Sequence, residues 1–363
     1  MANRATTTEL VPFAGLSGAQ RAGWRAMRAA NPALASPYFS LEFTDLMADR
    51  RHDAQALVLS RKGYTVGILP MQLSRWGVAR PLGGPLADHH GLITEENDLD
   101  IAAALESSPI SVLRFHGALA QQSGFAAKAS QIEPSWTVDL SQGHDAWLES
   151  RRLADAKAMR NIRARQRKLA ESGLDITFRL DDRRPEALGA TFANKREQYH
   201  RTHAFDVFIA KWARDLVGDL FQHQTQDLRG CLSTLEINGQ LAAAHFGMRS
   251  ETVLHYWFPV FWPEYAQYGP GLLLFMEMAR AMNASGIGTI HLGPGDADFK
   301  RKLANASFDI ASGSIEQPSM VAGLMAAGAG VDVFARRLPI GRVAHWPGKA
   351  LRRLDTLAAA YGI

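Results

Sequence analysis

The sequence predicts an α/β protein whose mixed sheets belong to two similar halves. Residues 253–302 read as a strand, a loop, a helix, a second strand and a second loop, a unit whose strands are parallel in nearly all known proteins. Two hairpins, turned at Gly63 and Gly239, also resemble each other in sequence: LVLSRKGYTVGILPMQ and STLEINGQLAAAHFGMR. Their offset of 176 residues suits a duplicated domain, and the alternative is that hairpins simply look alike.

Length and composition indicate a globular protein with two domains. The chain has 363 residues, of which 47% are hydrophobic and 21% charged. Its one cysteine, Cys231, excludes a disulfide within the chain, and no Cys/His cluster has the spacing of a zinc site, so we expect no metal. The net charge of +4 and the pI near 9.2 favour anionic ligands without indicating nucleic acid.

No segment reads as a secretory signal or a membrane span. The first residues, MANRATTTELVPF, lack a continuous apolar run, and the apolar runs 271–275 and 320–331 are far shorter than the roughly 20 residues that a bilayer requires. We therefore expect a cytoplasmic protein that could also associate with the surface of the inner membrane.

Residues 1–142 are predicted to form the first domain. A loop rich in glycine and proline, 81–91, ends on Asp88, His89 and His90, and titratable residues in a rigid loop are candidates for function. The alternative is that Asp88 only caps local backbone amides. Helices are expected at 16–30, 36–47, 99–105 and 118–124, and strands at 55–60, 64–73, 112–116 and 135–140.

A long basic helix, predicted over 144–171 and ended by Gly173, links the halves as residues 143–172. Its cations outnumber its acids. A face of this kind is usually solvated, but it could also line a cleft and attract a phosphorylated substrate. The cations are Arg151, Arg152, Lys157, Arg160, Arg163, Arg165, Arg167 and Lys168.

Residues 173–318 are predicted to form the second domain, and 319–363 a tail. The tail is rich first in Ala and Gly and then in Arg, and its spaced arginines predict an amphipathic segment. A short helix is expected to begin at Asp296, with that carboxylate as its N-cap. The other expected elements are 174–180, 185–199, 211–221, 231–237, 240–248, 253–258, 271–283 and 289–292.

The tripeptide Gly-Pro-Gly follows both strands of the strand-helix-strand unit, at 269–271 and 293–295. Because parallel strands end at one edge of a sheet, both loops are expected to face one crevice. The first loop opens into a helix, so free N–H groups and the positive end of the helix dipole suit a pyrophosphate there. Gly-Pro-Gly before a helix is otherwise often a plain turn.

A series of short motifs runs through the chain in order: Pro37-Tyr38-Phe39, Asp88-His89-His90-Gly91, the basic run 160–168, Lys195 to Tyr199, Tyr256-Trp257-Phe258, Tyr268 to Leu272, and Gly293 to Asp296 with Lys300. This series resembles a group of bacterial GNAT-fold acetyltransferases tied to the synthesis of cellulose, holdfast and other exopolysaccharides. The group is distantly related to FemAB aminoacyltransferases and has two GNAT-like domains. The likeness covers residues 10–315, and His291 departs from it, since many relatives carry Asp there.

The resemblance implies an N-acyltransferase that moves an acyl group from acetyl-CoA or another acyl-CoA to an amine. The acceptor would be an amino sugar of a surface polysaccharide, or its lipid- or nucleotide-linked precursor. Residues 267–271, Gln-Tyr-Gly-Pro-Gly, resemble the Gln-x-x-Gly-x-Gly pattern with which GNAT proteins hold the CoA pyrophosphate, with one residue fewer between the glutamine and the first glycine. The implied CoA-binding residues are Tyr256, Trp257, Phe258, Gln267, Gly269, Gly271 and Leu272.

Attack of a neutral amine on a thioester needs a proton acceptor and a polarised carbonyl. The candidate bases are Asp88, His89 and Asp296, with Glu236 a weaker one. A phosphate or sugar of the acceptor is expected to contact Lys195, Tyr199 and Lys300.

Two other classes of function remain open. One is a FemAB-like aminoacyltransferase that uses aminoacyl-tRNA, from which binding of CoA would distinguish the acyltransferase. The other is an exopolysaccharide effector regulated by an anionic ligand such as a cyclic dinucleotide, or by the membrane surface, through the arginines of the tail. Truncation of the tail would test the second class.

Overall fold

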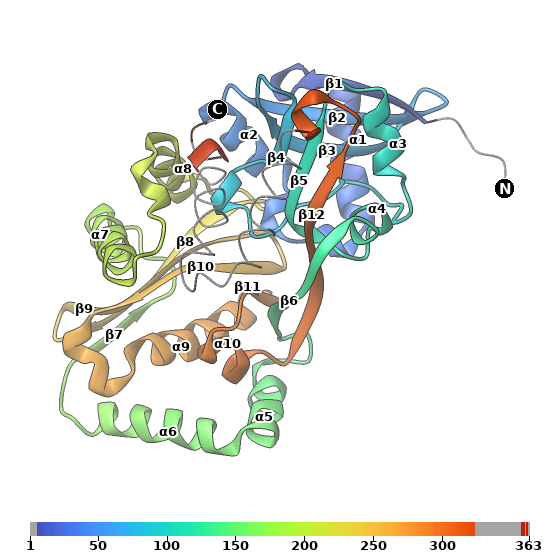
Figure 1. Cartoon of the computed structure of the whole chain (residues 1–363). Helices are drawn as coiled ribbons and strands as arrows, with labels where there is room; N and C mark the ends of the chain where they lie inside the picture. The colour runs from blue at the N-terminus through green and yellow to red at the C-terminus, as the bar shows by residue number, and fades with distance from the viewer. Residues whose placement is uncertain (1–5, 324–356, 360, 362–363) are drawn as a thin grey trace, which may run out of the picture. The chain divides into compact units, whose positions relative to one another are not determined.

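The computed structural model describes residues 6–323, 357–359 and 361, and the chain divides into two units whose elements Figure 1 labels. Unit 1 comprises Met1–Leu34, Phe43–Ile132 and Asp309–Ile363, and unit 2 comprises Ala35–Glu42 and Glu133–Phe308. Most of the predicted tail, including its arginine-rich segment, lies outside the described residues. No helix among the described residues is long and apolar enough to cross a membrane.

Unit 1 contains a mixed sheet with strand order β1-β2-β3-β4-β5-β12. Strands β4 and β5 are parallel, with Val78 opposite Val112, and the other neighbours are antiparallel. Its strands are β1 (Thr7–Pro12), β2 (Ala54–Arg61), β3 (Tyr64–Leu73), β4 (Val78–Pro81), β5 (Val112–Leu119) and β12 (Ala306–Glu316). The helices are α1 (Gly18–Ala30), α2 (Leu41–Arg50), α3 (Ile101–Glu106) and α4 (Ser123–Ala126).

Unit 2 contains a mixed sheet with strand order β6-β11-β10-β9-β8-β7, in which only β10 and β11 are parallel. Its strands are β6 (Ala129–Asp139), β7 (Ile176–Arg179), β8 (Arg229–Ile237), β9 (Gln240–Arg249), β10 (Val253–Phe261) and β11 (Thr289–Pro294). The helices are α5 (His144–Ala154), α6 (Ala156–Ala170), α7 (Pro185–Thr202), α8 (Lys211–Gln222), α9 (Pro270–Ala284) and α10 (Asp298–Leu303).

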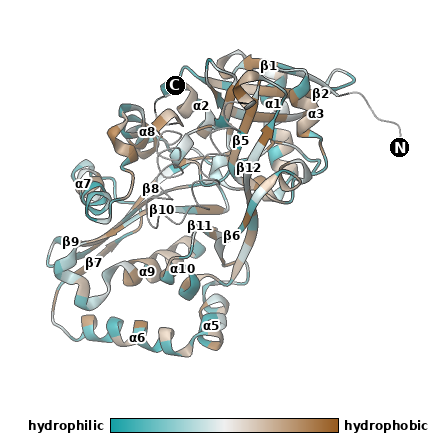
Figure 2. Cartoon of the chain, viewed as in Figure 1, coloured by the Kyte–Doolittle hydropathy of each residue, from teal (hydrophilic) through white to brown (hydrophobic). Residues whose placement is uncertain are grey.

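Helix α9 is the buried helix of unit 2, as its apolar sequence predicts. Its inner residues, Phe275 and Met278 among them, join the core that contains Leu254 of β10 and Ile290 of β11. Helix α6 lies along α9 in Figure 1 and is mostly hydrophilic in Figure 2, because only a narrow stripe that includes Ile162 is buried. The basic face of α6 is therefore left exposed.

The structure confirms both hairpins and the parallel strand-helix-strand unit. It also repeats one topology, because β2-β3-β4-β5 and β8-β9-β10-β11 each consist of two antiparallel pairs followed by a parallel pair. This shared order is the structural expression of the predicted duplication.

Several predicted elements are wrong. The linking helix is two helices, because Asp155 leaves the helical conformation (φ −145°) and its side chain caps α6 by accepting from the amide of Ala158. The helix predicted at 118–124 is mostly strand β5 and a turn, and α4 is short. Strands β1 and β12 were not predicted. Asp296 does not cap α10, whose N-cap is Ala297.

A β-bulge interrupts the pairing of β10 with β9. His255 faces Met248 and Phe258 faces Phe246, so Tyr256 and Trp257 together face Gly247. A Cβ atom on Gly247 would lie 2.3 Å from the carbonyl oxygen of His255, so only glycine fits opposite the bulge.

We predict that Gly247→Ala lowers the free energy of unfolding by about 1–3 kcal/mol, because the added methyl group must displace the backbone of β10. The matched control is Gly218→Ala inside α8, where a Cβ atom would meet no atom within 4 Å. Alanine should stabilise that helix by about 0.5–1 kcal/mol. Urea denaturation measures both changes, and equal stability of the two variants would contradict the required bulge.

Candidate functional site

A pocket of ≈ 350 Å³ opens in unit 2 beyond the point where β10 and β11 pair. Their parallel register covers only three pairs and ends with His255 opposite His291, although both strands continue. The lining is largely apolar. It comprises Arg165, Gln198, Tyr256, Pro259, Val260, Phe261, Ala266, Gly269, Pro270, Gly271, Leu272, Phe275, Phe299 and Leu303.

The first turn of α9 forms one end of this pocket. Gly269 has the left-handed conformation that glycine favours (φ 64°), and Pro270 opens the helix. Because Pro270 has no N–H, Gly271 supplies the first amide that the helix can offer to a ligand. A Cβ atom on Gly271 would meet no atom within 4 Å, so this residue borders open space. The arrangement suits an anion at the positive end of the helix dipole.

Helix α6 brings cations to the same end of the pocket. The guanidinium of Arg165 covers Gly269 so closely that a Cβ atom there would lie 2.2 Å from Nη1. One turn later, the ammonium of Lys168 lies 5.3 Å from the centre of the Tyr268 ring. The pocket therefore combines a positively charged end with an apolar body, which fits a ligand that carries phosphates and a long uncharged arm.

The bulge in β10 is held by a buried histidine of β9. His245 stacks on Tyr256, with ring centroids 4.1 Å apart, and its Nε2 accepts a hydrogen bond of 3.2 Å from the amide of Trp257. Burial, and then the charges of His255 and Lys195, keep the pKa of His245 well below its usual 6.5. The imidazole is therefore neutral at physiological pH and replaces the strand carbonyl that the bulge removes from the amide.

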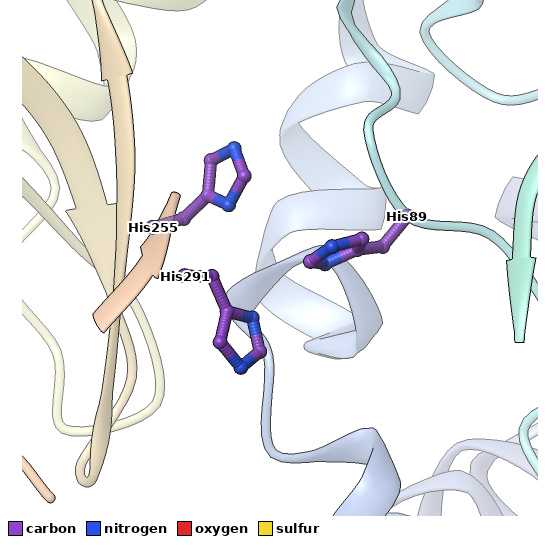
Figure 3. Close-up of side chains that lie close together, drawn as sticks. All are labelled: His89, His255 and His291. Atoms are coloured by element: carbon purple, nitrogen blue, oxygen red, sulfur yellow. The ribbon is translucent and has the colours of Figure 1, made fainter. Parts of the chain in front are cut away.

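Two further histidines lie side by side where the strands begin to separate. His255 and His291 are register partners on β10 and β11, and Figure 3 shows both side chains, together with His89, which belongs to unit 1. Burial, and then His255, lower the pKa of His291 to about 3, so its imidazole is neutral at physiological pH. An imidazole at this position adds no charge to the unit 2 core.

Lys195 on α7 lies directly behind the wall of the pocket. Its Nζ donates to Oε1 of Gln198 (3.2 Å) and to the carbonyl of Pro259 (3.3 Å), and both of these residues line the pocket. Burial lowers the pKa of Lys195 to about 8. A neutral amine can donate both of these hydrogen bonds and keep its lone pair, so Lys195 is positioned to exchange a proton near physiological pH.

The structure places the predicted CoA-binding residues in two groups. Tyr256, Gly269, Gly271 and Leu272 line the pocket, and burial raises the pKa of Tyr256 above its usual range, so the phenol keeps its proton. The other three are outside the lining: Trp257 and Phe258 lie at the bulge, and Gln267 is exposed in the turn Pro263–Tyr268.

The predicted acceptor-binding residues stand near the same strands. The ring of Tyr199 lies beneath Lys195, with Nζ 5.2 Å from the ring centre. Lys300 donates to the carbonyl of Pro294 at the end of β11. Both contacts are within unit 2.

The candidate bases differ in their surroundings. The carboxylate of Asp296 is 82% exposed and pairs with Arg301. Asp88 is half-buried and His89 buried in unit 1, in the loop after the turn Gly84–Leu86. Glu236 is buried and pairs with Arg184, a structural contact within unit 2. The catalytic roles of the first three stay predictions.

Sequence reasoning did not single out several lining residues. Arg165 was one of many arginines in a basic helix, and no spacing distinguished it from its exposed neighbours. Gln198 lies within the motif Lys195 to Tyr199 and Phe299 directly precedes Lys300, and neither was given a role of its own. Their position in the pocket depends on how α6, α7 and α10 pack against the sheet of unit 2.

Residues 156–301 match the family model of the acetyltransferase (GNAT) domain. The match begins at the first residue of α6, ends within α10 and contains every lining residue of the pocket except Leu303. No curated protein matches the chain. Residues 156–301 are therefore a GNAT-type acetyltransferase domain, and the chain is an N-acyltransferase.

Solved structures are similar to this chain over most of its length. FemX is similar with a TM-score of 0.57 at 10% identity, over 87% of this chain and 99% of that one. A conserved protein of unknown function from Bacteroides thetaiotaomicron gives 0.51 at 10% identity, over 82% and 97%. A tandem GNAT protein from the clavulanic acid biosynthesis pathway gives 0.49 at 14% identity, over 86% and 99%.

We predict that Lys195 makes the stability of the protein depend on pH between about 8 and 10.5. The pKa of Lys195 is lower in the folded chain than the 10.5 of an unperturbed lysine, so in this window the unfolded chain binds a proton that the folded chain lacks. The free energy of unfolding therefore rises with pH across the window, by at most about 3 kcal/mol.

The test compares the wild-type chain with Lys195→Met by urea denaturation across this window. The difference between their unfolding free energies should change as the pH rises from about 8 to 10.5, in favour of the wild-type chain. Lys211→Met, which removes an ammonium that is 79% exposed, is the control. A difference that stays constant for Lys195→Met would show that burial does not lower this pKa.

Proposed function

We propose that this N-acyltransferase moves an acyl group from acetyl-CoA or another acyl-CoA to the amine of an amino sugar, on a surface polysaccharide or on its lipid- or nucleotide-linked precursor. The observation that carries the donor half of the proposal is the unit 2 pocket, whose charged end is built by Gly271 and Arg165 and whose body is apolar. GNAT domains generally use acyl-CoA, and the match to that domain contains these residues.

The parts of acyl-CoA correspond to parts of the pocket. The pyrophosphate fits the first turn of α9, where the Gly271 amide, the helix dipole and the Arg165 guanidinium act together. The amide-bearing pantetheine arm fits along β10, because a strand edge without a partner can pair with an extended chain. The thioester would then reach the bulge at Tyr256 and Trp257.

The chemistry requires a carbonyl contact, a base and a proton for the leaving thiolate. Backbone amides of β10 near the bulge would polarise the thioester carbonyl, and their position is kept by His245 and Gly247. The protonated phenol of Tyr256 lines the pocket and would donate to the departing sulfur. Asp88, His89 and Asp296 are the proposed bases, and Lys195 is a further candidate because its pKa is about 8.

The acceptor class is supported by the series of motifs that runs from Pro37 to Lys300. Their order resembles acetyltransferases of exopolysaccharide synthesis, and this resemblance implies an amino-sugar acceptor. Binding of CoA by the purified chain would favour this function over transfer from aminoacyl-tRNA.

The first experiment tests the donor site with Gly271→Asp. The new carboxylate has room to fit, so the chain should fold, but it would stand at the pyrophosphate position and weaken acyl-CoA binding at least about tenfold through lost hydrogen bonds and repulsion. Isothermal titration calorimetry with acetyl-CoA measures the change.

The matched control is Gly189→Asp, which adds the same charge to α7, where a Cβ atom also meets no atom within 4 Å. It should bind acetyl-CoA like the wild-type chain. If both folded variants bind acetyl-CoA with equal affinity, the acyl-CoA site lies elsewhere in the chain.

The second experiment asks whether Asp296 is the base. If it is, Asp296→Asn should lower kcat about 10²- to 10⁴-fold, with little change in stability because the carboxylate is 82% exposed. Asp298→Asn is the control, because Asp298 lies two residues along, is 67% exposed and also contacts Arg301. Acyl transfer at the same rate by both variants would remove Asp296 from the list of bases.

A further inference from the structure

Three side chains in the lining of the unit 2 pocket are polar. They are the guanidinium of Arg165 near Gly269, the phenol of Tyr256 at the bulge and the amide of Gln198 on α7. The other lining residues are glycines or have apolar side chains. A ligand carbonyl that enters such a pocket loses its water and needs a hydrogen-bond donor there. Arg165 and Tyr256 already have roles in the proposed transfer, whereas Gln198 has none.

The bulge in β10 explains how a residue of α7 reaches the same pocket as α9. Tyr256 points toward α9, where its ring centroid lies 5.1 Å from that of Phe275. Phe258, two residues along the strand, points instead toward α7, with its ring centroid 5.5 Å from that of Phe192. In a regular strand both side chains would share one face, so the extra residue of the bulge switches the alternation. Gln198 thus lines from the α7 side a pocket that α9 lines from the other (Figure 1).

The second half of α7 is fixed against the end of β10. Nζ of Lys195 donates to the carbonyl of Pro259 (3.3 Å). Nδ2 of Asn194 donates to the carbonyl of Phe261 (3.4 Å). Both carbonyls belong to the part of β10 between the bulge and the loop before α9, and Gln198 lies one turn further along α7 than Asn194. An acyl-CoA that runs from the first turn of α9 to the bulge therefore passes Gln198.

Lys195 also determines which end of the Gln198 amide it meets. A lysine ammonium has three donors and no acceptor, so the atom that lies 3.2 Å from Nζ is the amide oxygen, Oε1. The NH2 group of Gln198 has no hydrogen-bond partner among the residues that the structure describes. Because Oε1 is used by Lys195, this NH2 group is the polar end of Gln198 that remains for a ligand, and it offers donors in a largely apolar pocket.

We propose that Gln198 is a specificity-determining residue of the donor site, whose side-chain NH2 group donates a hydrogen bond to a carbonyl oxygen of the bound acyl-CoA. Lys195 is a positioning residue that acts through Gln198, because it fixes the orientation of the amide. This role rests on the proposed function, since the carbonyl belongs to acyl-CoA. The thioester carbonyl and the amide carbonyls of the pantetheine arm offer the same acceptor chemistry, and the experiment distinguishes them.

Titration calorimetry of the full chain with acetyl-CoA tests Gln198→Glu and Gln198→Met. Glutamate has the same shape and keeps the contact with Lys195, so the chain should fold. It presents a second acceptor to the ligand carbonyl in place of the donor, so the affinity should fall at least about tenfold. Methionine removes the donor without adding charge, and the affinity should fall about three- to tenfold. The control is Gln222→Met at the exposed end of α8, which should bind like the wild-type chain.

Titration with CoA, which has no thioester, identifies the carbonyl. If Gln198→Glu weakens the binding of acetyl-CoA but not of CoA, the partner of Gln198 is the thioester carbonyl. If both ligands bind more weakly by the same factor, the partner is an amide carbonyl of the pantetheine arm.

The positioning role of Lys195 is tested by Lys195→Met in two backgrounds. If Lys195 acts through Gln198, this change weakens acetyl-CoA binding in the wild-type chain and has no further effect in the Gln198→Met chain. A role of Lys195 in the stability of the fold alone would give the same loss in both backgrounds, and that result would overturn the positioning role.

Equal affinity of the wild-type, Gln198→Glu and Gln198→Met chains for acetyl-CoA would overturn the proposal and leave the acyl-CoA site in place. Failure of the proposed function is a separate result, because a wild-type chain that binds no acetyl-CoA would contradict that function and this role with it.

Discussion

The site of unit 2 depends on the point at which β10 and β11 stop pairing. A bulge in β10 places Tyr256 and Trp257 opposite Gly247, and the strand then turns away from β11 after His255. Backbone groups released from a sheet are costly unless they find partners. His245 supplies one partner inside the unit, and the pocket leaves room for a ligand to supply others. One local irregularity therefore creates both the opening and the groups that can hold a ligand in it.

The buried titratable groups around this opening have lowered pKa values, and the permanent charge is exposed. The histidines nearest the sheet are buried, and the low pKa values of His245 and His291 keep both neutral, so they add no charge to the core. Lys195 on α7 is also buried, and its pKa is lowered to about 8. The permanent cation Arg165 stands at the exposed end. Because desolvation is costly only for buried charges, this arrangement lets the pocket attract an anion at its mouth without destabilising the sheet.

Local sequence patterns predicted the parts of the fold that local chemistry determines. The hairpins at Gly63 and Gly239 need residues that accept positive φ. The apolar residues on most sides of α9 predict a buried helix. The break at Asp155 was missed because the helical pattern continues through it, and one capping side chain decides it. Strand β12 was missed because it is stabilised by pairing with β5, far away in the sequence.

The residues of the candidate site also fall into two groups, those that local sequence patterns predict and those whose position depends on tertiary packing. Gly269 and Gly271 were predicted because a glycine loop before a helix has a direct physical meaning, whereas Arg165 could be distinguished from seven other cations only by its packing over Gly269. Lys195 belonged to a quoted motif, but its low pKa follows from burial that no local pattern encodes.

The two units show how one strand order can lead to different surroundings where the parallel strand pair ends. Each separates its parallel strands beside a glycine loop, which fixes where a pocket forms. In unit 2 the loop leads into the long helix α9, whose first backbone amides can bind a phosphate. The residues of β10 that line this pocket are largely apolar. In unit 1 only a short turn follows, and Arg80 and Arg114 occupy the strand positions instead. The element after the loop therefore decides whether helix amides or strand side chains stand at this edge of each sheet.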